Sequence, residues 1–222
     1  MKKISFIGLL ILTVLIYSCG NDFKSGYCKN QLKLIEPNTE LKLFEFKLDS
    51  KPDSILNLIE NTLKVDICDK VTNFGVQLED LKIKTFVFGE CNVTFLHKLS
   101  SNEIDLNKNG DVLIQMPNTY DGFIVTKIDS IPNWFEKHYP IKHNLHSNVI
   151  RLSWGSDVNQ KLIKKAIKNI ADGYLMSLNK KSIMSFNKEL CELSERETDK
   201  LKTENPFELE LRRVSSSKRI EE

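Results

Sequence analysis

The feature that most constrains the fold is a long amphipathic segment in the C-terminal third. Its apolar side carries Leu162, Ile163, Ala166, Ile167, Ile170, Tyr174 and Leu178, and its opposite side carries Lys161, Lys164, Lys165 and Lys168. This spacing predicts a helix that begins after Ser156 or Asp157 as N-cap and ends near Asn179. One face must be buried against another layer. The lysines are interpreted as a solvated face, the alternative being contact with anionic lipid headgroups.

The remaining segments predict a sheet that such a helix can cover. Strands are predicted over residues 31–36, 40–48, 81–88, 91–99, 103–106, 111–116, 122–127 and 148–154, and over 207–213 as a late edge strand. Further helices are predicted from Pro52 to about Val65, over 131–139 and after Ser185, with a capping-box pattern at Ser194 and Glu197. Residues 107–110, Asn-Lys-Asn-Gly, predict a hairpin turn because Asn and Gly tolerate positive φ. The order predicts an α+β fold, a mainly antiparallel sheet with helices packed on one face.

The first 22 residues indicate export. Lys2 and Lys3 precede an apolar run over residues 4–17, which is followed by the small residue Ser18 and by Cys19. A charged start, a short apolar segment and a small residue at the cleavage site are typical of a secretory signal peptide. An uncleaved transmembrane helix is the first alternative, but the run is shorter than the roughly 20 residues that a bilayer requires. An ordinary secretory signal with a coincidental cysteine is the second.

Residues 15–19, Leu-Ile-Tyr-Ser-Cys, resemble the lipobox of bacterial lipoproteins, although Tyr17 is bulkier than the residue usual at that place. The resemblance implies that Cys19 receives a thioether-linked diacylglycerol and becomes the first residue of the mature chain. Several acyl chains on one residue anchor a protein stably. We therefore expect a cell-envelope protein that is held to the membrane by lipid and faces the periplasm or the cell exterior.

The predicted organisation has four parts. Residues 1–18 are a cleaved signal helix, 19–30 a lipid-attached tether, 31–214 a single α+β domain and 215–222 a flexible tail. Lys2 and Lys3 account for the formal net charge of +2, so the mature chain is neutral. A neutral chain argues against nucleic acid as a partner, because phosphate binding relies on a basic surplus.

Four cysteines remain after Cys19, and they are Cys28, Cys68, Cys91 and Cys191. Export would place them in an oxidising compartment, where an even set can form disulfides. Four cysteines permit three pairings, and the sequence does not choose among them. Buried free thiols are the alternative. No closely spaced pair suggests a zinc ribbon or a thioredoxin-type site.

The densest group of metal-ligand residues is His138, His143 and His146, with Glu136 nearby. Three neutral imidazoles could hold one transition-metal ion. Their spacing does not match a helical HExxH pair, and Pro140 interrupts any helix between the first two, so surface histidines in a loop are the alternative. No GxSxG, SxxK, P-loop or GxGxxG motif occurs, and no catalytic residue or cofactor is predicted.

These observations favour a lipid-anchored envelope protein that binds a protein partner or supports a complex without catalysis. Two alternatives use other features of the chain. One is an envelope metal-binding protein or hydrolase built on the histidine loop. The other is an immunity-type inhibitor held at the membrane.

Overall fold

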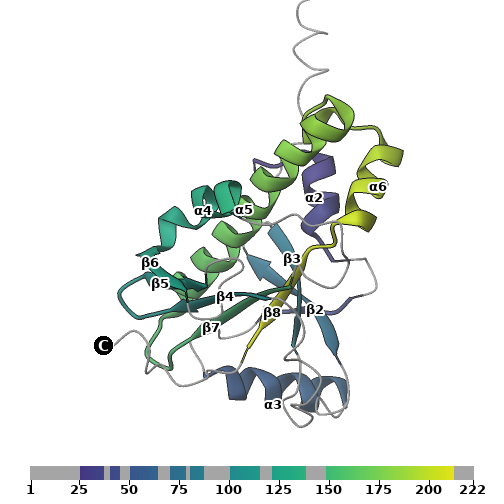
Figure 1. Ribbon diagram of the computed structural model, residues 1–222. Helices are drawn as coiled ribbons and strands as arrows, with labels where there is room; N and C mark the ends of the chain where they lie inside the picture. The colour runs from purple at the N-terminus through teal and green to yellow at the C-terminus, as the bar shows by residue number, and fades with distance from the viewer. Residues whose placement is uncertain are drawn as a thin grey trace, which may run out of the picture.

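The structure, a computed structural model, describes residues 26–37, 41–45, 51–64, 71–78, 81–87, 101–115, 122–138 and 149–212. These residues form an α+β fold with one eight-stranded sheet (Figure 1). The described helices are α2 (Lys29–Ile35), α3 (Pro52–Leu63), α4 (Ile131–His138), α5 (Gln160–Phe186) and α6 (Glu195–Glu204). Two 3-10 turns, η4 (Ile128–Ser130) and η5 (Leu190–Glu192), precede α4 and α6.

The strands are β1 (Leu43–Phe44), β2 (Thr72–Leu78), β3 (Leu81–Val87), β4 (Ser101–Leu106), β5 (Asp111–Gln115), β6 (Phe123–Lys127), β7 (Val149–Trp154) and β8 (Glu208–Leu211). Their order in the sheet is β1-β2-β3-β8-β7-β4-β5-β6. The pairs β1–β2, β3–β8, β8–β7 and β7–β4 are parallel, and the pairs β2–β3, β4–β5 and β5–β6 are antiparallel. The sheet is therefore mixed, and the prediction of a mainly antiparallel sheet was wrong.

Strands β7 and β8, in the centre of the sheet, are parallel because the long helix α5 is part of the connection between them. A parallel neighbour requires a crossover connection, and α5 with α6 carries the chain from the end of β7 back to the start of β8. Strand β8 consequently lies between β3 and β7 in the middle of the sheet, whereas the sequence predicted a late edge strand there. Its alternating pattern fits both positions, because alternation specifies the faces of a strand and not its neighbours.

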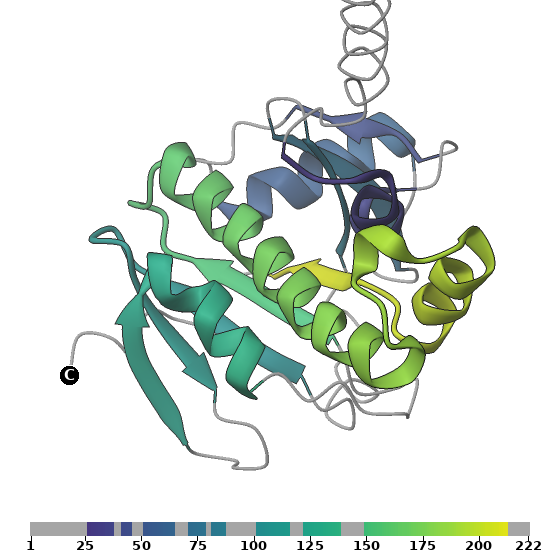
Figure 2. The same cartoon turned by 90° about the horizontal axis from the view of Figure 1, so that it is seen from above.

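The core lies between the sheet and α5. Figure 2 shows α5 crossing the strands, with α4 on one side and α2 and α6 on the other. Residues Ile163, Ile167, Ile170 and Leu178 of α5 are completely buried, as are Ile150 and Leu152 of β7. The predicted apolar face is confirmed, although the helix continues to Phe186 and its N-cap is Asn159, whose side chain accepts a hydrogen bond from the Leu162 amide.

The predicted lysine face of α5 is solvent-exposed and partly paired with acids. Lys165 lies 2.6 Å from Asp129, and Lys168 lies 2.7 Å from Asp172. Both lysine side chains remain about half exposed. Two of the four predicted lysines are thus paired within the domain, as expected of a solvated face.

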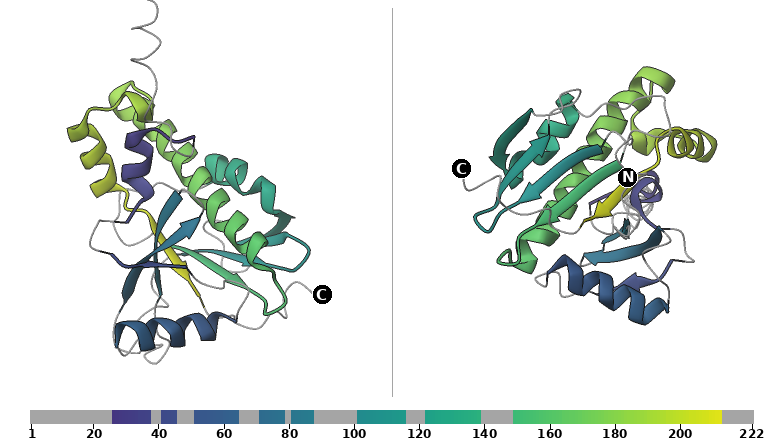
Figure 3. Two further views of the ribbon diagram at one scale, coloured as in Figure 1. Left: turned by 180° about the vertical axis from the view of Figure 1, so that it is seen from behind. Right: turned by 60° about the horizontal axis from the view of Figure 1, so that its bottom comes forward.

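Helix α3 lies on the opposite side of the sheet from α5, as Figure 3 shows from behind and from below. The prediction of helices on a single face therefore holds for α2, α4, α5 and α6 and is wrong for α3. The helix itself was predicted at this place, and Pro52 occupies its first turn, where the missing N–H costs no hydrogen bond.

Residues 31–36 were predicted as a strand, but residues 31–35 are helical and Glu36 is the C-cap of the helix. Helix α2 begins after Cys28, and the Gln31 side chain accepts a hydrogen bond from the Cys28 amide. Leu34 and Ile35 are buried against the core. Leu32 and Leu34 alternate with Gln31 and Lys33 as in a strand, and the segment is short enough to fit either period.

The hairpin predicted at residues 107–110 is confirmed. Strands β4 and β5 pair across it, Gly110 has φ of 77°, and the Asn107 side chain accepts hydrogen bonds from the amides of Asn109 and Asp111. Strand β2, which the sequence analysis did not predict, pairs with β3 along its whole length. The predicted strand over 91–99 and turn at 89–90 lie outside the described residues.

Candidate functional site

The described chain begins at a junction with α5 that depends on Tyr27. Gly26 has φ of 78°, a conformation that favours glycine, and Tyr27 after it is only 8% exposed. The Tyr27 hydroxyl donates a hydrogen bond to Asp172 and accepts one of 3.0 Å from Lys168 Nζ. The same ammonium group lies 5.4 Å from the centre of the Tyr27 ring. Burial and the neighbouring Asp172 carboxylate raise the pKa of the Tyr27 hydroxyl, so it stays a neutral donor.

A disulfide fixes the next residue. Cys28 is bonded to Cys191, which lies 163 positions later in the chain, and their Cα atoms are 5.8 Å apart. The Asn30 amide strengthens this contact by donating hydrogen bonds of 2.9 and 2.8 Å to the carbonyls of Leu190 and Leu193. We call Tyr27, Cys28 and Asn30 with their partners the N-terminal junction. Residues of the predicted tether 19–30 thus lie inside the fold, and residues 20–25 separate Cys19 from the first described residue.

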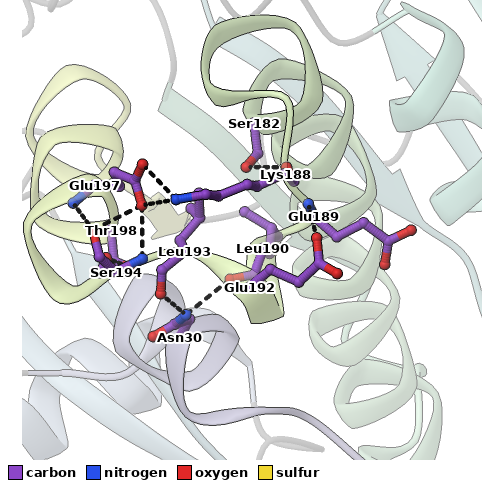
Figure 4. A network of polar contacts seen from close by, with 10 residues as sticks. All are labelled: Asn30, Ser182, Lys188, Glu189, Leu190, Glu192, Leu193, Ser194, Glu197 and Thr198. Carbon is purple, nitrogen blue, oxygen red and sulfur yellow. Dashed lines mark hydrogen bonds and ion pairs between the residues drawn. The ribbon is translucent and has the colours of Figure 1, made fainter.

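The segment that receives Cys28 is itself held firmly, as Figure 4 shows. Lys188 Nζ lies 2.9 and 3.0 Å from the two carboxylate oxygens of Glu197. Ser194 caps α6, and Glu197 accepts a hydrogen bond of 2.8 Å from the Ser194 amide, which confirms the predicted capping box. The Lys188 ammonium group, with help from Ser194, lowers the pKa of the Glu197 carboxyl to about 2.

A second cluster of charges lies on the face of the sheet that points away from α5. Arg151 of β7 stands in register between Glu103 of β4 and Glu210 of β8. Its Nε lies 2.7 Å from Glu210, and its Nη1 lies 3.8 Å from Glu103. The Arg151 and Glu210 side chains are only 8% and 5% exposed. Arg212 continues the row with a contact of 3.1 Å to Glu103.

This cross-strand cluster neutralises itself. Its arginines lie next to carboxylates on neighbouring strands, so each positive charge is balanced by a negative charge within the sheet. Opposite charges directly across a strand pair stabilise one register, and a slip of one residue would place a charge in the apolar core. The arrangement explains how three parallel strands, β4, β7 and β8, align.

The predicted metal site is only partly within the described residues. His138 ends α4, is exposed, and its ring centre lies 5.6 Å from that of Trp134. His143 and His146 lie outside the described residues. Within the part of the chain that the structure describes, no group of three or more His, Cys, Asp or Glu side chains could hold a metal ion.

The disulfide is one of the pairings that the sequence left open, and Cys19, Cys68 and Cys91 lie outside the described residues. Sequence reasoning did not find Tyr27, Asn30 or Asp172 as junction residues. No local signal marks them, because Tyr27 and Asp172 meet only when the N-terminal segment packs on α5. The position of Cys28 soon after the apolar N-terminal segment is the one hint that the sequence offers.

Comparison of the chain with protein-family models, with curated proteins and with solved structures gives no match. Of the described helices, none has the length and apolar composition needed to cross a bilayer.

Proposed function

We propose that this protein is a lipid-anchored component of a bacterial cell envelope, acylated at Cys19, whose folded domain binds a protein partner or supports a complex without catalysis. The observation that carries the proposal is the disulfide between Cys28 and Cys191. Disulfides persist in exported proteins and are rare in the cytosol, where thiols are kept reduced. It supports export independently of the apolar segment and lipobox at the N-terminus.

The N-terminal junction suits a protein that is tethered by its first residue. If Cys19 is anchored by lipid, any pull between the membrane and the domain acts through residues 20–27. The disulfide and the two Asn30 hydrogen bonds attach the N-terminal segment to the connection between α5 and α6. The Lys188–Glu197 ion pair holds that connection in place. A covalent bond at this point keeps the tether from peeling away from the domain.

The pairing of charges in the cross-strand cluster favours a binding role over catalysis. In the cross-strand cluster, on the face of the sheet opposite α5, the arginines pair with carboxylates, as Arg151 does with Glu210. General acid–base catalysis instead needs a group held free to exchange a proton with a substrate. The use of these charges within the sheet therefore supports a binding role over a catalytic one.

Mass spectrometry of the mature N-terminus tests the anchor. We expect a chain that starts at Cys19 and carries acyl groups, and membrane fractionation should find the protein with the envelope. Cys19→Ala should remain unprocessed and lose the acyl groups. An unmodified start at another residue, or an intact Met1 in the wild type, would contradict the proposal.

Crosslinking in intact envelopes tests the binding role. Wild-type protein should give a discrete crosslinked species with one protein at constant stoichiometry, and soluble domain lacking residues 1–19 should compete for it. The proposal would be contradicted if no such crosslinked species formed in the envelope and the protein instead turned over a substrate.

A further inference from the structure

Two consecutive residues near the C-terminal end of α5 have exposed apolar side chains. Ile183 is 45% exposed and Met184 is 87% exposed, the highest value among the large apolar side chains in the described part of the chain. We call these two residues the α5 tip. The helix ends at Phe186, and its C-cap Asn187 adopts the left-handed conformation with φ of 53°. Much of the apolar surface of these two side chains is therefore not packed against the described residues.

The α5 tip lies at the same end of the molecule as the N-terminal junction. Asn179, one turn before the tip, accepts a hydrogen bond of 2.9 Å from the amide of Leu190, next to Cys191. Ser182 donates one of 2.8 Å to the carbonyl of Lys188. The turn η5, bonded to Cys28, is therefore fixed directly beside the last turns of α5. Figures 1 and 3 show this end of α5 close to α2, with α3 at the opposite end of the molecule.

The length of chain before Cys28 limits where a membrane can lie. Eight residues, 20–27, lie between Cys19 and Cys28. The nine steps from one Cα to the next cover at most about 3.3–3.6 Å each, so the reach is about 30 Å. A lipid on Cys19 thus keeps the end of the domain that carries the α5 tip within reach of the bilayer. This step rests on the proposed lipid anchor.

We propose that the α5 tip is a membrane-contact site, at which Ile183 and Met184 enter the interfacial layer of the bilayer that holds Cys19. Two side chains form a patch far smaller than a stable protein–protein interface. A bilayer needs no complementary surface, and covalent attachment at Cys19 makes the contact effectively intramolecular. The contact orients the domain, so that the opposite end with α3 faces outward.

Tryptophan fluorescence of the acylated full-length protein tests the contact. Met184→Trp is compared with Leu58→Trp, in which the replaced side chain is 46% exposed on α3 at the other end. Both variants keep the buried Trp134 and Trp154 as a constant background. The proteins are reconstituted into vesicles of phosphatidylethanolamine and phosphatidylglycerol whose acyl chains carry bromine, and acylation of Cys19 is verified by mass spectrometry.

We expect several-fold stronger bromine quenching and a blue-shifted emission for Met184→Trp relative to Leu58→Trp. Equal quenching of the two variants on acylated protein would overturn the membrane contact and leave the anchor standing. A blue shift at position 184 without bromine quenching would also overturn it, since a protein surface would then cover the tip. Absence of acyl groups on Cys19 would overturn the proposed function and, with it, this inference.

Discussion

At the scale of single residues, the sheet depends on charges that are buried and paired. Arg151 and Glu210 are almost inaccessible to solvent, and removing an ion from water is costly unless a partner with good geometry replaces the water. Their contact of 2.7 Å supplies that partner, and Glu103 adds a second carboxylate to Arg151. The pair therefore contributes more to alignment of the strands than to net stability.

Removing one member of this pair should destabilise the domain strongly. Glu210→Ala leaves Arg151 without its closest carboxylate, and we expect a loss of about 3–5 kcal/mol in the free energy of unfolding, measured in urea. The double variant Arg151→Met with Glu210→Leu should lose less, because no buried charge remains. Glu204→Ala, which removes an exposed contact of 3.9 Å to Lys200, is the control and should cost at most about 1 kcal/mol. A loss for Glu210→Ala as small as the control would contradict this role.

The Glu197 carboxyl should make stability depend on pH. Its folded pKa of about 2 lies below the ordinary 4.5, so the ionised form stabilises the fold above that ordinary value. This stabilisation should be lost as the pH falls from about 5 to about 2. Glu197→Gln keeps an oxygen for the Ser194 amide and removes the charge, so its free energy of unfolding should fall less over this range. Chemical denaturation at stepwise pH measures the difference.

The control for this titration is Glu195→Gln, in the same helical turn, whose side chain is 84% exposed. It should keep the wild-type dependence of stability on pH. If Glu197→Gln and the wild type had parallel profiles below pH 5, the assigned effect of Lys188 on this carboxyl would be wrong.

At the scale of elements, the position of α4 on α5 is set by a close approach at one glycine. A Cβ atom added at Gly173 would lie 2.7 Å from Cβ of Phe135 and 3.0 Å from the backbone Cα of Pro132. One turn further along α5, the Ser177 hydroxyl donates a hydrogen bond of 2.8 Å to the carbonyl of Phe135. The missing side chain lets α4 come close enough for this bond, which explains a glycine inside a long helix.

Gly173→Ala should therefore lower stability although alanine is the better helix former. Intrinsic propensity favours alanine by about 1 kcal/mol, but the clash with α4 should outweigh it and leave a net loss of about 1–3 kcal/mol. Thermal and urea unfolding would measure this loss. Ser185→Ala, at an exposed position of the same helix, should be neutral or slightly stabilising. A more stable Gly173→Ala variant would show that α4 does not pack as closely as described.

At the scale of the whole molecule, the disulfide joins the N-terminal end of the described fold to the connection between α5 and α6. Cys28 precedes the first described helix and Cys191 lies in η5, between α5 and α6, so the bond closes a loop that contains most of the sheet. A crosslink across so long a loop restricts the unfolded chain strongly, and it also fixes α2 onto the α5–α6 connection. Stability and attachment of the N-terminal segment are therefore coupled.

Replacing both cysteines should reveal this coupling. Cys28→Ala with Cys191→Ala should lose about 2–5 kcal/mol in the free energy of unfolding, because the unfolded chain gains freedom. Each single replacement should cost about as much as the double one, since either removes the same bond. Limited proteolysis should cut the double variant near residue 28 before it cuts within α5. Additive losses from the two single replacements would contradict a shared bond.

The sequence by itself determined those elements whose signals are local. The period of α5, the Asn-Gly turn between β4 and β5, the proline start of α3 and the capping box of α6 each depend on residues a few positions apart. Local period and turn chemistry act before any tertiary contact forms, so they can be read directly. Residues 31–36 were wrongly predicted as a strand, because one or two helical turns are too short to establish a period.

Only the tertiary structure decided how these elements are joined. The central place of β8 depends on Arg151 meeting Glu210, 59 residues away, and the pairing of Cys28 depends on Cys191, 163 residues away. Such contacts are selected by the packing of the whole chain, because an alternating strand or a cysteine carries no mark of its partner. The sequence specified the apolar face of α5, but only the fold decided that this helix continues to Phe186 and placed its exposed tip near Cys28.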